Sequence, residues 1–290
     1  MFLVIGGNSE IGAATARHLG AQGDRVVSTT RRAAENGGPI ALDFGLPLGD
    51  WRAPTGTRAA CIFVAVARLA ACQADPDGSA LINCERTIEL VDRLAEDGIY
   101  TLFLSTNQVF DGQLAQVPAD DPAAPVSEYG RQKAHTEQAL KDRMAAGAGV
   151  GILRLAKVVS PGMTLLQDWI RELAAGKPIR AFSDMTMAPT PTDLVAQAIA
   201  AMLRQREPVI AQLTGPRDIT YADVARFAAE QIGADATLVE PVSALDHGMP
   251  PGATPANTTL DSTYLRDRHA IIVPDALDVI KASIAVCKRR

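Results

Sequence analysis

The chain opens with a short apolar run at residues 2–5, a glycine-rich turn and a helix-like stretch at residues 10–22. This order suits a dinucleotide, because backbone must approach a pyrophosphate closely and a helix N-terminus must point at it. Gly6 and Gly12 take the outer places of a Gly-x-x-Gly-x-x-Gly pattern, whereas Ser9 takes the middle one. A tight turn before a helix needs glycine in any α/β protein, so the turn alone is a weak signal. The residues that we expect to contact a dinucleotide here are Gly6, Asn8, Ser9, Glu10, Ile11 and Gly12.

Apolar runs alternate with amphipathic stretches through the first half of the chain, which is the signature of a parallel, doubly wound α/β sheet. Further strands are expected at 25–29, 40–42, 61–66, 99–104 and 151–159, and helices at 79–96 and 128–144. After Pro161 the pattern changes to helices near 164–175 and 193–204, a return strand at 209–213 and a small α/β region. We therefore predict a Rossmann-type sheet with a smaller C-terminal α/β domain.

Tyr129 and Lys133 stand four residues apart in one expected helix, and Ser105 and Thr106 follow an expected strand upstream. On a helix this separation places the phenol and the ammonium on one face. A free tyrosine has a pKa of about 10, and an adjacent positive charge stabilises its phenolate. A hydroxyl at the end of the strand would hold a substrate carbonyl within reach of the phenol. Such pairs also occur by chance on helices, but together with the glycine turn this group favours reduction of a ketone or oxidation of an alcohol.

Four segments resemble one family. Residues 105–112 are similar to its Ser-Thr-Asp-Tyr-Val-Phe-x-Gly, and residues 129–133 to its Tyr-Gly-x-x-Lys. Residues 188–194 resemble its Pro-Thr-x-x-x-Asp-Leu with one residue of slippage, and residues 255–261 its Arg-Pro-x-Asn-Ser-x-Leu-Asp. The family is the extended, nucleotide-sugar branch of the short-chain dehydrogenases/reductases, and within it the chain most resembles dTDP-4-dehydrorhamnose reductase and its relatives.

The resemblance implies a mechanism of ketone reduction. Tyr129 would be the general acid, Thr106 would bind the carbonyl oxygen, and Ser105 would be the substitute for Thr106. Lys133 would lower the pKa of Tyr129 and hold the nicotinamide ribose. Asn83 would order a water in a proton relay.

The resemblance also implies an architecture of two interleaved domains. Residues 1–159 and 189–215 would bind NADP, and residues 160–188 and 216–290 would bind the substrate. In extended members of the superfamily, helices corresponding to 79–96 and 128–144 often pair across a two-fold axis. Both stretches carry an apolar face, so we expect a homodimer.

The turn after the second expected strand indicates which dinucleotide binds. An acidic side chain there bonds the ribose 2′-hydroxyl of NAD, whereas arginine accommodates the 2′-phosphate of NADP. Arg31 and Arg32 stand there, and a guanidinium binds phosphate through two parallel hydrogen bonds. Two arginines that merely solvate a helix start would oppose its dipole, so we predict NADP. Asp43, after the third strand, resembles the family's adenine-contacting acid, or it is a solvated turn residue.

The expected substrate side departs from the rhamnose-pathway pattern. Gln108 and Asn107 replace a tyrosine and an aspartate, Lys157 replaces an aromatic residue at a substrate-stacking position, and Thr254 stands where arginine precedes proline. We expect the substrate to contact Ser105, Gln108 and Lys157. A sugar nucleotide or similar ketosugar other than that of the rhamnose pathway is favoured, and the rhamnose-pathway substrate stays open as an alternative.

Composition excludes other classes. A net charge of −5 leaves no basic footprint for nucleic acid, and no apolar stretch approaches the roughly 20 residues of a membrane span. The first strand begins at Phe2, so we expect no signal peptide. Four cysteines without Cys-x-x-Cys spacing suit reduced thiols in the cytoplasm, and the histidines form no metal-ligand pattern.

Two alternatives to a reductase remain open on the sequence. A nucleotide-sugar epimerase or dehydratase would keep the cofactor and both catalytic hydroxyls, but such enzymes typically use NAD, and Arg31 and Arg32 argue against them. A non-catalytic NADP-binding regulatory protein would not need Thr106, Tyr129 and Lys133, and all three are present.

Overall fold

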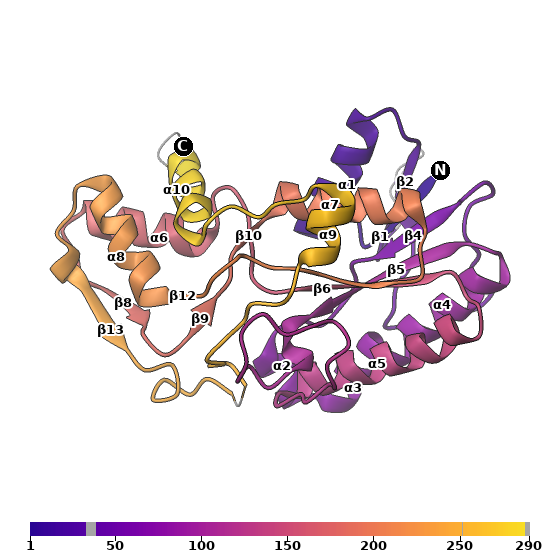
Figure 1. Ribbon diagram of the computed structural model, residues 1–290, viewed down its shortest axis with the longest axis horizontal. Helices are drawn as coiled ribbons and strands as arrows, with labels where there is room; N and C mark the ends of the chain where they lie inside the picture. The colour runs from indigo at the N-terminus through magenta and orange to yellow at the C-terminus, as the bar shows by residue number, and fades with distance from the viewer. Residues whose placement is uncertain (33–38, 251, 288–290) are drawn as a thin grey trace.

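Seven parallel strands form the central sheet of the chain in the computed structural model, which describes residues 1–32, 39–250 and 252–287 (Figure 1). In order across the sheet they are β11 (Ile210–Leu213), β6 (Val150–Leu155), β5 (Tyr100–Thr106), β4 (Ala59–Ile62), β1 (Phe2–Ile5), β2 (Val26–Thr30) and β3 (Ile40–Ala41). The order reverses between β1 and β4, the point outside which doubly wound sheets bind their ligands. The Rossmann-type prediction is confirmed.

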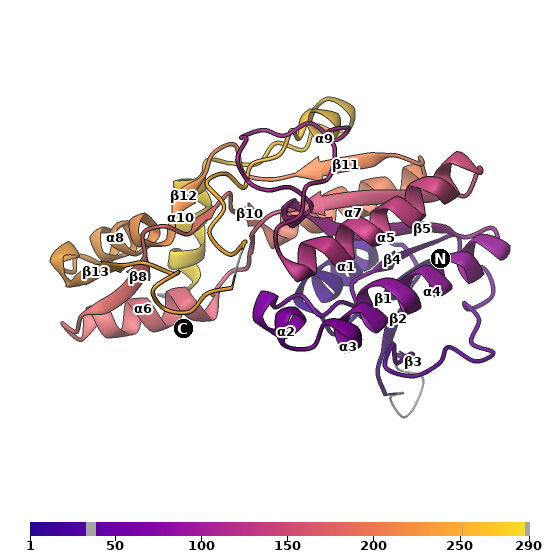
Figure 2. The same cartoon turned by 90° about the horizontal axis from the view of Figure 1, so that it is seen from below.

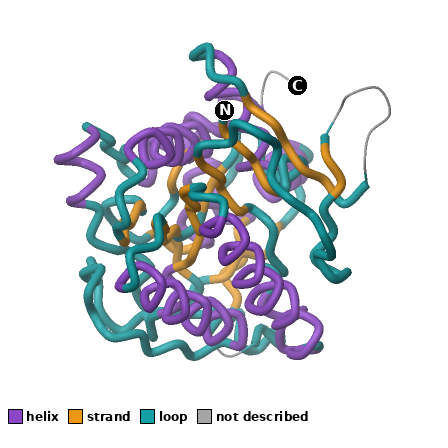
Figure 3. The backbone as a smooth tube through the Cα atoms, turned by 90° about the vertical axis from the view of Figure 1, so that its right-hand side faces the viewer, coloured by secondary structure: helices purple, strands orange, loops and turns teal. Residues whose placement is uncertain are grey.

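Helices cover both faces of this sheet, as Figure 3 shows by purple coils on either side of the orange strands. One face carries α1 (Glu10–Ala21) and α7 (Thr192–Gln205), which pack on each other, and the opposite face carries α4 (Thr87–Glu96) and α5 (Glu128–Ala145). Successive strand residues alternate between the two cores, as Phe2 and Leu3 do. Because both faces are buried, the strands are continuous apolar runs.

A second hydrophobic core lies beside the sheet, at the left of Figure 1 and apart from the sheet in Figure 2. Its elements are α6 (Thr164–Ala174), β8 (Ile179–Phe182), β9 (Thr186–Met187), β12 (Ile219–Thr220), α8 (Tyr221–Ile232), β13 (Val239–Val242) and α10 (Ala276–Cys287). Segments from both sides of α7 and β11 contribute to it, so the chain crosses between the two cores more than once. The domain boundaries expected from the sequence stay a prediction.

Two expected elements are interrupted. The strand predicted at 151–159 ends at Leu155, and β7 (Val158–Val159) pairs instead with β10 (Thr190–Pro191), where the chain leaves the sheet for the second core. The helix predicted at 79–96 consists of α3 (Pro76–Ala80), a π-helical segment (Leu81–Arg86) and α4. The Thr87 hydroxyl donates to the carbonyl of Ile82 across this wider turn, at 2.9 Å.

The short elements complete the chain. They are α2 (Leu69–Ala74), α9 (Thr263–His269) and two 3-10 turns (Asn107–Val109 and Ala236–Leu238). Within the described ranges, no helix is long and apolar enough to cross a membrane, and no three side chains of the metal-binding kinds gather at one point.

The apolar faces of α4 and α5, from which a homodimer is expected, pack inside the chain. Leu90, Leu94 and Leu140 lie in the core beneath the sheet. The exposed positions of α5 include Arg131, His135 and Gln138, which are polar. These faces therefore do not support a dimer interface, and the homodimer stays a prediction.

Candidate active site

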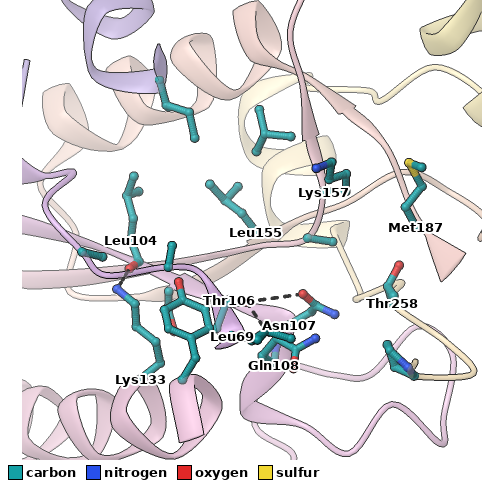
Figure 4. A pocket seen from close by; sticks show the side chains of 18 of the residues that line it. Leu69, Leu104, Thr106, Asn107, Gln108, Lys133, Leu155, Lys157, Met187 and Thr258 are labelled. Atoms are coloured by element: carbon teal, nitrogen blue, oxygen red, sulfur yellow. Dashed lines mark hydrogen bonds between the residues drawn. The ribbon is translucent and has the colours of Figure 1, made fainter. Parts of the chain in front are cut away.

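A cavity of about 440 Å³ opens where the carboxyl ends of β4, β5 and β6 face the second core (Figure 4). The strand ends supply Ile62, Thr106 and Leu155, and the far wall includes Met187 and Thr258. A cavity at the topological switch point of a parallel sheet is the expected place for a ligand in this architecture.

The glycine-rich turn brings the start of α1 to this cavity. Gly6 has a φ of +87°, a conformation that L side chains rarely adopt. A Cβ at Gly12 would lie 2.7 Å from the Gly6 carbonyl oxygen, so only glycine permits this approach. Ser9, in the middle place of the pattern, is the N-cap of α1, and its Oγ accepts a hydrogen bond from the Gly12 amide at 3.1 Å. The serine in the middle place of the glycine pattern therefore stabilises the start of α1 as its N-cap.

A second cavity, of about 420 Å³, lies on the other side of this turn. Its lining residues are Asn8, Thr30, Arg31, Arg32 and Asp43. Both arginines are exposed, and one oxygen of Asp43 accepts from the Gly45 amide at 2.9 Å, as a turn aspartate does. Ile11 lines the first cavity and Asn8 the second, so the start of α1 separates two spaces that suit the two halves of a dinucleotide.

Helix α5 places Tyr129 and Lys133 on the wall of the first cavity. Ser127 caps the helix by accepting from the Gly130 amide at 3.0 Å. A Cβ at Gly130 would lie 2.1 Å from the Gln108 carbonyl oxygen, so glycine lets the first turn of α5 lie directly against the end of β5. Tyr129, the residue before Gly130, lines the same cavity as Thr106.

The ammonium of Lys133 is bound within the chain. Its Nζ donates to the Leu104 carbonyl at 2.8 Å (Figure 4). It lies 4.3 Å from the centre of the Phe103 ring and 5.9 Å from that of the Tyr129 ring. Burial lowers the pKa of Lys133 to about 8, and Glu137 acts in the opposite direction. Burial also raises the pKa of Tyr129 well above its usual value. The structure thus shows the opposite of the expected lowering of the Tyr129 pKa, because burial disfavours the charged phenolate.

Ser105 and Thr106 point to different partners at the end of β5. The Ser105 hydroxyl donates to the carboxylate of Glu137. The Thr106 hydroxyl donates to Asn107 Oδ1 at 3.4 Å and accepts from the Gln108 amide at 3.2 Å, at the cavity wall. Both residues line the cavity, but the Ser105 hydroxyl is bound to Glu137, so Ser105 is a poor substitute for Thr106.

Gln108 and Lys157, two residues expected to contact substrate, also line the cavity. Gln108 accepts at Oε1 from the Ser127 hydroxyl at 3.1 Å, which fixes its side chain. Lys157 is half-buried, and burial lowers the pKa of its ammonium, with Glu10 acting in the opposite direction.

Asn83 lies outside the cavity, in the π-helical segment. Its Oδ1 accepts from the Val66 amide at 2.8 Å, and its Nδ2 donates to the Val66 carbonyl at 3.0 Å and to Gln132 Oε1 at 2.7 Å. These contacts engage the side-chain amide within the chain, and the expected water-ordering role stays a prediction. They hold the segment that follows β4.

Two features of the site were missed in the sequence. Glu137, four residues after Lys133, forms a fully buried ion pair with Arg154, and the Lys133 to Glu137 spacing was a usable signal. Tyr221, the first residue of α8, lines the cavity from the second core, and no local pattern indicates that approach.

The strand order, the glycine turn and the Tyr/Lys pair define a Rossmann-type, NAD(P)-dependent oxidoreductase. The chain belongs to the RmlD substrate binding domain family, which it matches over residues 1–288. A probable dTDP-4,6-dihydroxy-2-methyloxan-3-one 4-ketoreductase of Streptomyces antibioticus is 30% identical over 237 residues, which cover 77% of this chain and 79% of that protein. A dTDP-4-dehydrorhamnose reductase of Burkholderia thailandensis is 26% identical over 94% of both chains.

Solved structures share the fold. A dTDP-4-dehydrorhamnose reductase of Yersinia enterocolitica superimposes with a TM-score of 0.82 and 19% identity over 99% of both chains. The enzyme of the same name from Bacillus anthracis, in complex with NADP, gives a TM-score of 0.80 and 15% identity over 100% of this chain and 98% of that one.

Proposed function

We propose that the chain is an NADPH-dependent reductase that converts the ketone of a 4-keto sugar nucleotide, or of a similar ketosugar, into an alcohol. The observation that carries this proposal is the convergence of Thr106, Tyr129 and Lys133 on one cavity at the carboxyl ends of the strands. Its curated relatives are reductases of such sugars by name. A neighbouring structure of the same fold contains NADP.

Each residue of the site has its own role in the proposed reduction. The Thr106 hydroxyl binds the carbonyl oxygen, and Tyr129 gives that oxygen its proton. The reduced nicotinamide, when bound, supplies a hydride to the carbonyl carbon. Lys133 would hold the nicotinamide ribose, and its positive charge would stabilise the phenolate that remains after Tyr129 has given up its proton. The start of α1 would bind the diphosphate of the cofactor, and Arg31 and Arg32 would bind its 2′-phosphate.

The lining of the cavity argues against a dehydratase. Elimination of water from a sugar needs an acid for the departing hydroxyl in addition to the tyrosine. Among the described residues of the lining, none is an aspartate or a glutamate. The epimerase and the regulatory alternatives stay open to test, and so does the cytoplasmic location expected from the sequence.

A screen of nucleotide-linked 4-keto sugars, followed by the loss of NADPH absorbance, tests the reductase. We expect consumption with at least one keto sugar and none with the matching 4-hydroxy sugar nucleotide. NADPH that binds well but is consumed with no keto sugar would favour the regulatory protein.

We expect NADPH to bind more tightly than NADH, because Arg31 and Arg32 face the second cavity. Replacing both arginines by alanine should weaken NADPH about 10- to 100-fold and leave NADH nearly unchanged, since hydrogen bonds to charged groups contribute roughly 1.5–3 kcal/mol. Cofactor fluorescence titration measures both affinities. The matched control replaces Arg171 and Arg180 by alanine. Both are exposed arginines on elements that surround the second hydrophobic core. Equal or inverted affinities in the wild-type protein would contradict the assignment.

A further inference from the structure

The charge of the active-site cavity has one sign. Lys133 and Lys157 are the cations among its described lining residues, and no carboxylate faces them there. A cavity with low-dielectric walls and charges of one sign concentrates ligands of the opposite sign. Lys133 donates to the Leu104 carbonyl and is assigned above to the nicotinamide ribose, so Lys157 is the cation that remains available to the substrate.

Lys157 is held in place by its backbone, and its ammonium is left without a close partner. Its carbonyl accepts from the Thr190 amide at 2.9 Å, where the chain leaves β6. Within the described part of the chain, its Nζ makes no hydrogen bond and no ion pair within 4.0 Å. Burial lowers the pKa of this ammonium, and Glu10, which acts in the opposite direction, offsets only part of its lost hydration. An anion bound beside the ammonium in the cavity would offset the rest.

Tyr221 supplies a second donor to the same cavity. Its side chain is only 8% exposed and packs in the second core, yet it lines the cavity. Its amide donates to the Met185 carbonyl at 3.1 Å, which fixes the start of α8, but no described residue bonds its phenol oxygen. Burial raises the pKa of Tyr221 to about 12, so the phenol stays a neutral donor.

We propose that Lys157 and Tyr221 form an oxyanion-binding subsite for the substrate, separate from the carbonyl-binding group of Thr106 and Tyr129. Two donors without a partner in the chain, one of them charged, match an oxyanion better than a neutral sugar hydroxyl. A hydroxyl would leave the positive charge of the Lys157 ammonium without a counter-charge. The oxyanion is a carboxylate on the sugar or a phosphate attached to it. This inference rests on the proposed function, because it takes the sugar to lie in this cavity.

Equilibrium binding by calorimetry, with protein saturated with NADP, tests the subsite without turnover. The probes are UDP, dTDP, UDP-glucose, dTDP-glucose and UDP-glucuronate. Lys157→Met should weaken the binding of each probe that carries the recognised oxyanion about 10- to 100-fold. Tyr221→Phe should weaken the binding of the same probes about 3- to 10-fold. Lys177→Met removes an exposed lysine beside the second hydrophobic core and should leave the affinity for every probe unchanged. Thermal melting checks that each variant is folded.

The pattern across the probes identifies the source of the oxyanion. A loss by Lys157→Met for UDP-glucuronate alone supports a sugar carboxylate, whereas an equal loss for every probe supports a phosphate. A wild-type protein that binds none of the probes, an unchanged affinity in Lys157→Met, or a loss confined to NADP itself would overturn the subsite. Binding without consumption of NADPH by any keto sugar would instead overturn only the reductase.

Discussion

Tyr129→Phe is expected to abolish turnover and to leave the affinity for NADPH nearly intact. The phenylalanine ring still packs at the start of α5, but the transferable proton is gone. General acid catalysis typically contributes about 10²- to 10⁴-fold, or roughly 3–5.5 kcal/mol of the barrier. Steady-state rates with a keto sugar found in the screen, and NADPH titration by fluorescence, measure the two effects separately.

Tyr264→Phe is the matched control for this loss of a phenol. The Tyr264 hydroxyl donates to Glu207 Oε2 at 2.7 Å, outside the cavity, so its removal should leave turnover unchanged. Lys133→Ala should differ from Tyr129→Phe, because it removes both a positive charge and a ribose contact and weakens NADPH as well. If Tyr129→Phe turned over within a few fold of the wild type, Tyr129 would be a packing residue and the catalytic assignment would be wrong.

The central sheet could be predicted because its strands are buried on both faces. Runs such as residues 2–5 and 99–104 are apolar throughout, and turns and helices separate them. The interruption at residues 156–157 could not be predicted, because residues 158–159 remain apolar while they pair with β10. The π-helical segment was hidden for a similar reason. Its residues give no pattern that separates a π-helix from an α-helix, and the hydrogen bonds of Asn83 that accompany it depend on tertiary contacts.

The candidate site was predictable where its residues are close in sequence. Tyr129 and Lys133 lie on one helix, and Thr106 ends the strand beside it, so spacing was enough to group them. The orientation of each hydroxyl could not be predicted from the sequence, because Ser105 and Thr106 are neighbours with similar side chains. Only the folded structure shows that the Ser105 hydroxyl donates to Glu137. Tyr221 reaches the cavity through the second core, and such long-range approaches leave no local pattern.

Arg154→Met is expected to lower the free energy of unfolding by about 3–5 kcal/mol, because it leaves a buried carboxylate without its main counter-charge. Arg154 and Glu137 have no exposed side-chain surface. The guanidinium donates to the Glu137 carboxylate at 2.7 and 3.0 Å, and to the Gln212 side chain at 3.1 Å. The pair thereby joins α5, β6 and β11, and through Ser105 it reaches the end of β5. Urea denaturation followed by circular dichroism measures the change.

Two further variants separate the buried pair from general effects of losing an arginine. Arg204→Met breaks an exposed ion pair with Asp24 and should cost only about 0–1 kcal/mol. Replacing Glu137 and Arg154 together by methionine should recover most of the loss, because no charge is then left unpaired in the core. An Arg154→Met protein as stable as Arg204→Met would show that the pair is dispensable. The positions of Ser105 and α5 beside the cavity would then depend on apolar packing alone.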